Sequence, residues 1–136
     1  MNQIQINLVK NTFDLVAKIP AETVGKLFYN RLFEIAPEVR PMFGRSEIVE
    51  QSRKLIGMLS YIINRLDNLE SIIDEISKLA QRHINYGVLP EHYKPVGESL
   101  LWTLKQGLGS NWNKDVEEAW TVCYVTLSNA MIEVYK

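Results

Sequence analysis

Cysteine is nearly absent from this sequence, in which Cys123 is the only one among 136 residues. A single cysteine excludes an intrachain disulfide and a metal cluster held by several cysteines, and it fits a reducing setting. Long apolar runs are also lacking, since no stretch approaches the roughly 18 residues that a membrane-spanning helix needs. The first residues, MNQIQINLVKNTF, interrupt their apolar positions with Asn, Gln and Lys, which argues against a signal peptide. We therefore expect a cytoplasmic protein without a membrane partner.

Charge of one sign is not in excess either. Lys plus Arg number 15 and Asp plus Glu number 16, which gives a formal net charge of −1. This balance offers no electrostatic reason to expect nucleic acid or an anionic membrane as the main partner. Hydrophobic residues make up 46% and charged residues 23%, close to globular averages. The length fits one compact domain over residues 1–136.

Apolar residues recur with helical spacing along almost the whole chain, and runs of strict alternation are lacking. This pattern predicts an all-α protein with about six main helices. We expect them over residues 4–18, 20–35, 47–66, 69–86, 90–108 and 114–135, with Asn113 as a cap for the last and an irregular stretch at 37–46. Periodicity alone leaves open a helical bundle or a fold of more obliquely packed helices.

The expected helix over 69–86 places a histidine on a buried face. Its apolar stripe consists of Ile72, Ile73, Ile76, Leu79 and Ala80, and the next helical step reaches His83. One interpretation is a core histidine satisfied by a hydrogen bond. The other is a ligand to a metal or haem iron, because neutral imidazole is a common iron ligand. The second histidine, His92, stands at the start of a helix, where we expect it to be exposed.

Two hydrogen-bond donors stand near the apolar stripes of other helices. Gln51 and Leu55 are spaced i, i+4, so an amide interrupts an apolar face. Tyr29 precedes Leu32 by three residues, at the edge of its own stripe. Each has an ordinary explanation, as a boundary tyrosine or a glutamine near a helix start. Together with His83, they form a set on three helices that could face a common cavity.

Four strings of the sequence carry a family resemblance: LFYNRLFEIAPEVRPMF, EQSRKL, LAQRHINYGVLPEHYKPVGESLL and AWTVCY. In their order and spacing they resemble the single-domain bacterial haemoglobins and the globin half of flavohaemoglobins, over essentially the whole chain. The positions that carry the match are Tyr29, Pro37, Phe43, Gln51, His83, Tyr93 and Trp120. The resemblance implies a globin fold around a haem pocket, with haem b (iron protoporphyrin IX) as the cofactor.

The resemblance also implies roles for individual residues. His83 corresponds to the proximal iron ligand, Phe43 packs on the haem face, and Tyr29, Gln51 and Leu55 line the distal side. The remaining expected cofactor contacts are Leu59, Val88, Tyr93, Val96 and Leu100. Lys54 and Arg82 are candidates for the haem propionates, although a solvated helix face is the favoured role for each. Gly25 and Ser52 match a pair of small residues that lets two helices cross closely.

Elementary chemistry supports the distal roles. Dioxygen held at an iron with one imidazole ligand carries partial negative charge on its outer atom, which hydrogen-bond donors stabilise. The Tyr29 hydroxyl and the Gln51 amide can both donate, whereas Leu55 only excludes water. A hydrogen bond to a charged group contributes roughly 1.5–3 kcal/mol, which raises oxygen affinity on the order of 10- to 100-fold. Because an amide is a poor iron ligand, we expect a resting ferrous state with five ligands.

The sequence departs from the flavohaemoglobin pattern in two places. It contains no glycine-rich nucleotide loop, so electrons for turnover would come from an external reductase. A carboxylate that completes the proximal network of that family is replaced by Tyr135, while Glu133 lies two residues earlier on another helix face. This second departure argues against peroxidase-like activation of oxygen.

We therefore expect a globin that reversibly binds dioxygen and other diatomic gases such as nitric oxide. The turnover that we expect is nitric oxide dioxygenation, with Tyr29 and Gln51 as the catalytic pair and nitric oxide detoxification as the outcome. The alternatives are oxygen transport, storage or scavenging without turnover, a haem-based gas sensor, and a helical interaction protein without haem. The sequence leaves monomer and homodimer equally open.

Overall fold

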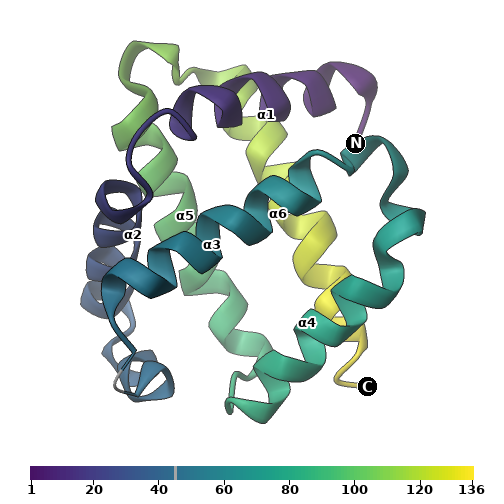
Figure 1. The fold of residues 1–136 in the computed structure, drawn as a ribbon. Helices are drawn as coiled ribbons and strands as arrows, with labels where there is room; N and C mark the ends of the chain where they lie inside the picture. Colours follow the sequence, from purple (N-terminus) through teal and green to yellow (C-terminus); the bar gives the residue numbers. More distant parts are fainter. Residues whose placement is uncertain (45) are drawn as a thin grey trace.

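The computed structural model describes residues 1–44 and 46–136, and that part of the chain contains helices and no strand. Six α-helices follow one another (Figure 1): α1 (Gln3–Val16), α2 (Ala21–Ile35), α3 (Ile48–Ile63), α4 (Ile73–Asn85), α5 (Tyr93–Leu108) and α6 (Lys114–Glu133). Short 3-10 helices connect them: η1 (Pro37–Phe43), η2 (Leu66–Ile72), η3 (Pro90–His92) and η4 (Gly109–Asn111). The all-α prediction with six main helices is confirmed. None of the helices described is both long and apolar enough to cross a bilayer.

Asparagine side chains cap the N-termini of two of the helices. At α1, the Asn2 side chain accepts a hydrogen bond from the Gln5 N–H at 2.8 Å, and the Gln5 side chain accepts from the Asn2 N–H at 3.2 Å. At α6, the Asn113 side chain accepts from the Val116 N–H at 2.9 Å, which confirms the expected cap. These contacts satisfy N–H groups that have no partner within the helix.

The connection between α3 and α4 differs from the expectation. Helix α3 ends at Ile63, and α4 begins only at Ile73 because η2 lies between them, with Asn68 in a non-helical conformation. The break changes the phase of the apolar stripe, and Ile73 is 54% exposed. The prediction that Ile73 is buried is therefore wrong. The stretch expected to be irregular also forms η1 over most of its length, while Arg45 lies outside the described residues.

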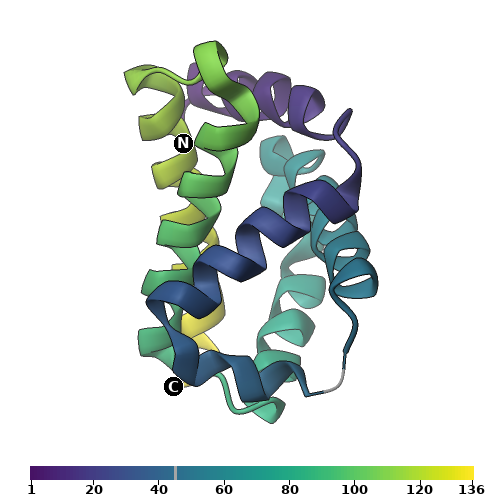
Figure 2. The same ribbon diagram turned by 90° about the vertical axis from the view of Figure 1, so that its left-hand side faces the viewer.

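The helices cross obliquely and do not form a parallel bundle. In Figure 1, α1 lies across the top and α3 passes diagonally in front of α5 and α6. In Figure 2, α2 runs diagonally while α5 stands nearly upright. At one crossing, the Trp120 indole on α6 donates to the Thr12 hydroxyl on α1 at 2.9 Å, and both side chains are buried. This arrangement decides between the two fold alternatives that periodicity leaves open.

The buried core is divided into two clusters. The larger joins α1, α2, α3, α5 and α6 and contains Tyr29, Leu32, Leu100, Leu104 and Trp120. The smaller joins α3, η2, α4, α5 and α6 and contains Ile62, Ile72, Ile76, Ala80, Tyr93 and Met131. Half-buried apolar side chains border both clusters, among them Leu55, Leu59 and Val96 on the first and Met58, Leu79 and Val88 on the second. Among the candidate site residues, Tyr29 and Leu100 belong to the larger cluster and Tyr93 to the smaller.

Candidate functional site

Tyr29 is the best-buried polar side chain of the predicted distal group. It lies on α2 with 5% of its surface exposed, and its hydroxyl donates to the backbone carbonyl of Gln51 on α3 at 3.4 Å. Burial raises the pKa of Tyr29 to about 12. The phenol is therefore neutral at physiological pH and keeps its hydrogen. The structure thus brings Tyr29 and Gln51 together.

Aromatic rings surround Tyr29. The Phe43 ring meets it edge-on, with centroids 5.3 Å apart and an interplanar angle of 75°. Phe33 stacks on Tyr29 at 6.1 Å and also contacts Phe43 at 5.4 Å. Phe33 is missing from the residues predicted for the site, although its spacing of i+4 from Tyr29 on α2 could have revealed it. These rings provide an apolar wall in which only the Tyr29 hydroxyl is polar.

Gln51 and Leu55 both lie on α3, one helical turn apart, and both are half-buried. Between them, Ser52 is fully buried against Gly25 of α2. The small residues at this contact allow α2 and α3 to approach closely. Tyr29 follows Gly25 by one helical turn, and Gln51 immediately precedes Ser52. The helix crossing therefore brings Tyr29 to the backbone of Gln51.

His83 lies in the last turn of α4 and is half-buried. Its Nδ1 is 2.7 Å from the backbone carbonyl oxygen of Leu79. A carbonyl oxygen can only accept, so Nδ1 carries the hydrogen and Nε2 keeps its lone pair. Burial lowers the pKa of His83, which favours the neutral ring at physiological pH. A neutral imidazole whose other nitrogen is held by a carbonyl has the chemistry of a metal ligand.

Tyr93 and Val88 adjoin His83. The Tyr93 ring lies nearly parallel to the imidazole, with centroids 6.3 Å apart and an interplanar angle of 24°. The Val88 N–H donates to the His83 carbonyl at 3.0 Å. His92, expected to be exposed, is instead only 9% exposed, because its Nδ1 accepts the Leu89 N–H at 2.9 Å and ties the side chain to the start of η3. That prediction is wrong.

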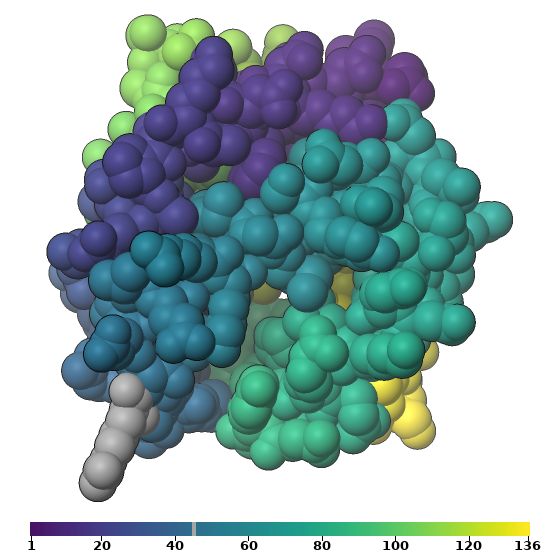
Figure 3. Space-filling view, in the orientation of Figure 1, coloured from purple at the N-terminus to yellow at the C-terminus, as the bar shows by residue number. Residues whose placement is uncertain are grey.

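A hollow opens between α3 and α4, and parts of the chain with the colours of α5 and α6 are visible at its floor (Figure 3). Between the same helices lies a cavity of about 280 Å³. Its lining is apolar apart from a few polar side chains, and it consists of Met58, Tyr61, Ile62, Ile72, Glu75, Ile76, Lys78, Leu79 and Arg82. Leu79 and Arg82 belong to the turn that carries His83. The charged side chains of the lining are the cationic Lys78 and Arg82 and the anionic Glu75, and Arg82 is the one predicted cofactor residue among the lining residues.

The other predicted cofactor residues lie on α3 and α5. Leu59 and Val96 are half-buried, and Leu100 is 7% exposed within the larger core cluster. Lys54 is exposed on α3, where it pairs with Glu50 at 3.5 Å. Of the two predicted propionate partners, Arg82 thus lines the cavity, whereas Lys54 lies on a solvated helix face with an anionic partner of its own.

Comparisons with known proteins agree with this architecture. A family model described as Globin matches residues 26–131. A flavohemoprotein of Vibrio cholerae is 32% identical to this chain over 98% of the chain's residues. A flavohemoprotein of Halalkalibacterium halodurans is 31% identical over 100% of the chain's residues. It spans about a third of the length of these relatives, 34% and 33% respectively.

A solved structure of a bacterial globin from Campylobacter jejuni superposes on this chain with a TM-score of 0.85. The sequence identity is 30%, and the match covers 98% of this chain and 95% of that one. Family model, relatives and fold all agree with the resemblance found in the sequence. The chain belongs to the globin family and has the globin fold.

Proposed function

We propose that this chain forms a single globin domain over residues 1–136 that holds haem b through His83 and binds dioxygen, nitric oxide and similar diatomic ligands. The observation that carries the proposal is the 2.7 Å contact between His83 Nδ1 and the Leu79 carbonyl, which leaves Nε2 as the basic nitrogen. When bound, haem supplies an iron with an open coordination position. The single cysteine, Cys123, fits a cytoplasmic setting for such a protein.

The residues proposed to hold the cofactor are mainly apolar. Phe43, Leu55 and Leu59 belong to the distal side, and Val88, Tyr93, Val96 and Leu100 to the proximal and inner side. Arg82 is the favoured partner for a propionate because it lines the cavity, and Lys54 is a second candidate that would have to leave Glu50. Apolar walls exclude water, and the cationic side chains match the charge of the propionates.

Tyr29 and Gln51 are the proposed catalytic and ligand-stabilising residues. The neutral Tyr29 hydroxyl and the Gln51 amide can each donate a hydrogen bond to a dioxygen molecule held in the site. The Tyr29 hydroxyl donates a long hydrogen bond to the Gln51 backbone carbonyl. At 3.4 Å this bond is weak, so the hydroxyl can turn to a ligand at little cost.

The proposed turnover is nitric oxide dioxygenation, in which nitric oxide and dioxygen take up one electron and form nitrate. An external reductase is the proposed source of this electron. Oxygen transport, storage or scavenging, and gas sensing with a partner protein, use the same pocket without sustained turnover.

Hemin titration of the haem-free protein tests the proposal. The protein should bind one hemin and develop an intense absorption band, and the reduced form should bind carbon monoxide and dioxygen. His83→Gly should lose this spectrum and recover it with free imidazole. His92→Asn is the matched control, since an asparagine oxygen can replace the acceptor for the Leu89 N–H. A protein that stays colourless with hemin, or a His83→Gly variant with an unchanged spectrum, would contradict the proposal.

Rapid mixing of the oxygenated protein with nitric oxide tests the turnover. Nitrate formation at every cycle in the presence of a reductase supports dioxygenation. A single stoichiometric burst without further cycles supports storage or scavenging, and release of intact dioxygen supports transport.

A further inference from the structure

A short chain of hydrogen bonds ends just beyond α6. Tyr135 is half-buried, and its hydroxyl donates to the carbonyl oxygen of Val88 at 2.8 Å. The same hydroxyl oxygen is 3.3 Å from the hydroxyl oxygen of Tyr93. Because the Val88 carbonyl can only accept, it takes the single hydroxyl hydrogen of Tyr135, and Tyr93 must be the donor to Tyr135. The hydrogen bonds therefore run from Tyr93 to Tyr135 and from Tyr135 to Val88.

Both ends of this series of hydrogen bonds, Val88 and Tyr93, adjoin His83. Val88 donates its N–H to the His83 carbonyl at 3.0 Å, so its peptide units connect the backbone of His83 to Tyr135. At the other end, the Tyr93 ring lies alongside the imidazole. The Tyr135 ring meets the Tyr93 ring edge-on, with centroids 6.1 Å apart and an interplanar angle of 86°. The Tyr135 side chain thus contacts both the backbone of Val88, which follows His83, and the Tyr93 side chain, which lies beside the imidazole.

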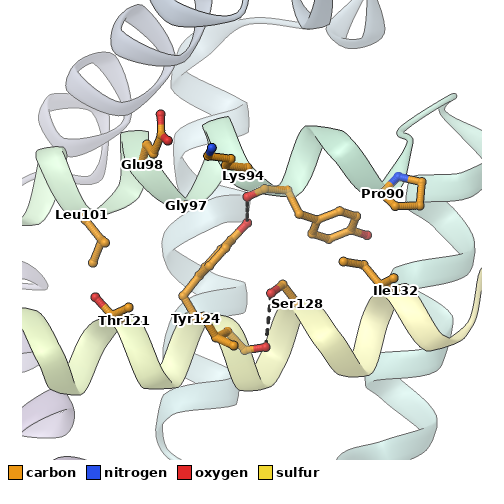
Figure 4. A pocket seen from close by; sticks show the side chains of 11 residues that line it. Pro90, Lys94, Gly97, Glu98, Leu101, Thr121, Tyr124, Ser128 and Ile132 are labelled. Carbon is orange, nitrogen blue, oxygen red and sulfur yellow. Dashed lines mark hydrogen bonds between the residues drawn. The ribbon is translucent and has the colours of Figure 1, made fainter.

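A second tyrosine fixes Tyr93 at its backbone. The Tyr124 hydroxyl on α6 donates to the Tyr93 carbonyl at 2.6 Å, and Figure 4 shows the Tyr124 side chain reaching from α6 to α5. Gly97 makes room for it, since a Cβ there would lie 2.6 Å from the Tyr124 ring. Tyr124 therefore keeps the start of α5 in place without help from Tyr135. The connection between α4 and α5 is different.

That connection is mostly exposed. Tyr86 is 64% exposed and Leu89 is 49% exposed, and Gly87 between them has a φ of +90°. These residues contribute little burial that would hold the connection in place. The bond from Tyr135 to Val88 spans 47 positions in the sequence and anchors this exposed stretch to the end of α6.

We infer that Tyr135 is a positioning residue for His83: its hydroxyl anchors the Val88 carbonyl and the Tyr93 hydroxyl and thereby orients the imidazole toward the cofactor. This inference rests on the proposed role of His83 as the haem ligand. Tyr135 itself need not touch the cofactor, because it acts through Val88 and Tyr93. Its effect on His83 is one of position, exerted through these two hydrogen bonds.

The test measures how fast the full chain loses hemin to an excess of a hemin-scavenging protein. Tyr135→Phe removes the hydroxyl and both of its hydrogen bonds, so hemin loss should accelerate about two- to tenfold. Tyr93→Phe keeps the stacked ring and the bond from Tyr135 to Val88, so its effect should be smaller. The double variant should match Tyr135→Phe alone, because both bonds depend on the Tyr135 hydroxyl. Tyr86→Phe is the control and should equal the parent protein.

The iron–imidazole stretching band of the reduced protein gives a readout that general destabilisation does not move. It should shift or broaden in Tyr135→Phe and stay unchanged in Tyr86→Phe. Faster hemin loss with an unaltered band, or an unaltered rate, would overturn the inference. Should Tyr135→Phe fail to fold, Tyr93→Phe decides: a hemin-loss rate and a band that both equal those of the parent protein would overturn the inference. A parent chain that binds no hemin would contradict the proposed function, whereas normal hemin binding with unaltered variants would contradict only the role of Tyr135.

Discussion

Gly25 on α2 and Ser52 on α3 meet at the point where the two helices cross. A Cβ atom at Gly25 would lie 1.6 Å from the Ser52 hydroxyl oxygen and 2.2 Å from its Cβ. Ser52 has no exposed surface, and its hydroxyl donates to the Ile48 carbonyl at 2.5 Å. The contact therefore leaves no room for a larger side chain. It also sets the distance between Tyr29 and Gln51, which lie next to it on the same helices.

Gly25→Ala should lower the free energy of unfolding by about 1–3 kcal/mol, because the added methyl group forces α2 and α3 apart. Urea unfolding of the haem-free protein measures this change. Gly57→Ala on α3 is the matched control, since a Cβ there has no neighbour within 4 Å and the residue is exposed. It should stabilise the helix by about 0.5–1 kcal/mol. Equal stability of Gly25→Ala and the parent protein would show that the helices separate freely.

Tyr29→Phe should speed oxygen dissociation by about tenfold or more, because it removes a neutral hydroxyl donor and leaves the ring in its aromatic surroundings. Rapid mixing of the oxygenated protein with carbon monoxide measures the dissociation rate. Tyr86→Phe, which changes an exposed phenol, should leave the rate unchanged. If Tyr29→Phe released oxygen at the parent rate, its hydroxyl would not donate to the ligand.

The stability of the haem-free protein should fall in mild acid through His83. Burial places the pKa of His83 in the folded protein below its ordinary value of 6.5. The unfolded chain then binds the proton at a higher pH than the folded chain does. The free energy of unfolding therefore decreases as the pH falls from about 6.5 to the lower pKa of the folded state. His83→Gln should show a flatter profile over this range.

Urea unfolding between about pH 7 and about pH 5 provides the measurement for both proteins. His92 and the carboxylates are present in both and cancel in the comparison. Identical slopes for the parent protein and His83→Gln would show that burial does not disfavour the charged imidazole.

Cys123 should be inert in the folded protein. It is 2% exposed, and burial raises the pKa of its thiol to about 12. Because the thiolate is the reactive form, a disulfide reagent such as dithiobis(nitrobenzoate) should modify it only after the chain opens. Following the colour change at mild alkaline pH, with a sample in guanidinium as the fully reactive reference, measures this protection. Rapid modification of the folded protein would contradict it.

Local patterns in the sequence predicted much of the architecture correctly. Helical spacing identified six helices, and Asn113 caps the last of them as expected. Two exposures were wrong for local reasons that spacing does not contain. A break at Asn68 turns Ile73 outward, and a hydrogen bond to the Leu89 N–H draws His92 inward.

The sequence by itself determined that the chain is helical, that His83 follows a buried stripe, and that Tyr29 and Gln51 stand near the inner faces of their helices. These properties follow from the positions of neighbouring residues along one helix. Only the tertiary structure decided which nitrogen of His83 keeps its lone pair and how near Tyr29 comes to Gln51. It alone also brought Tyr135 onto the connection after α4. Such contacts join residues far apart in the sequence, and they depend on the angles at which the packed helices cross, which helical periodicity does not specify.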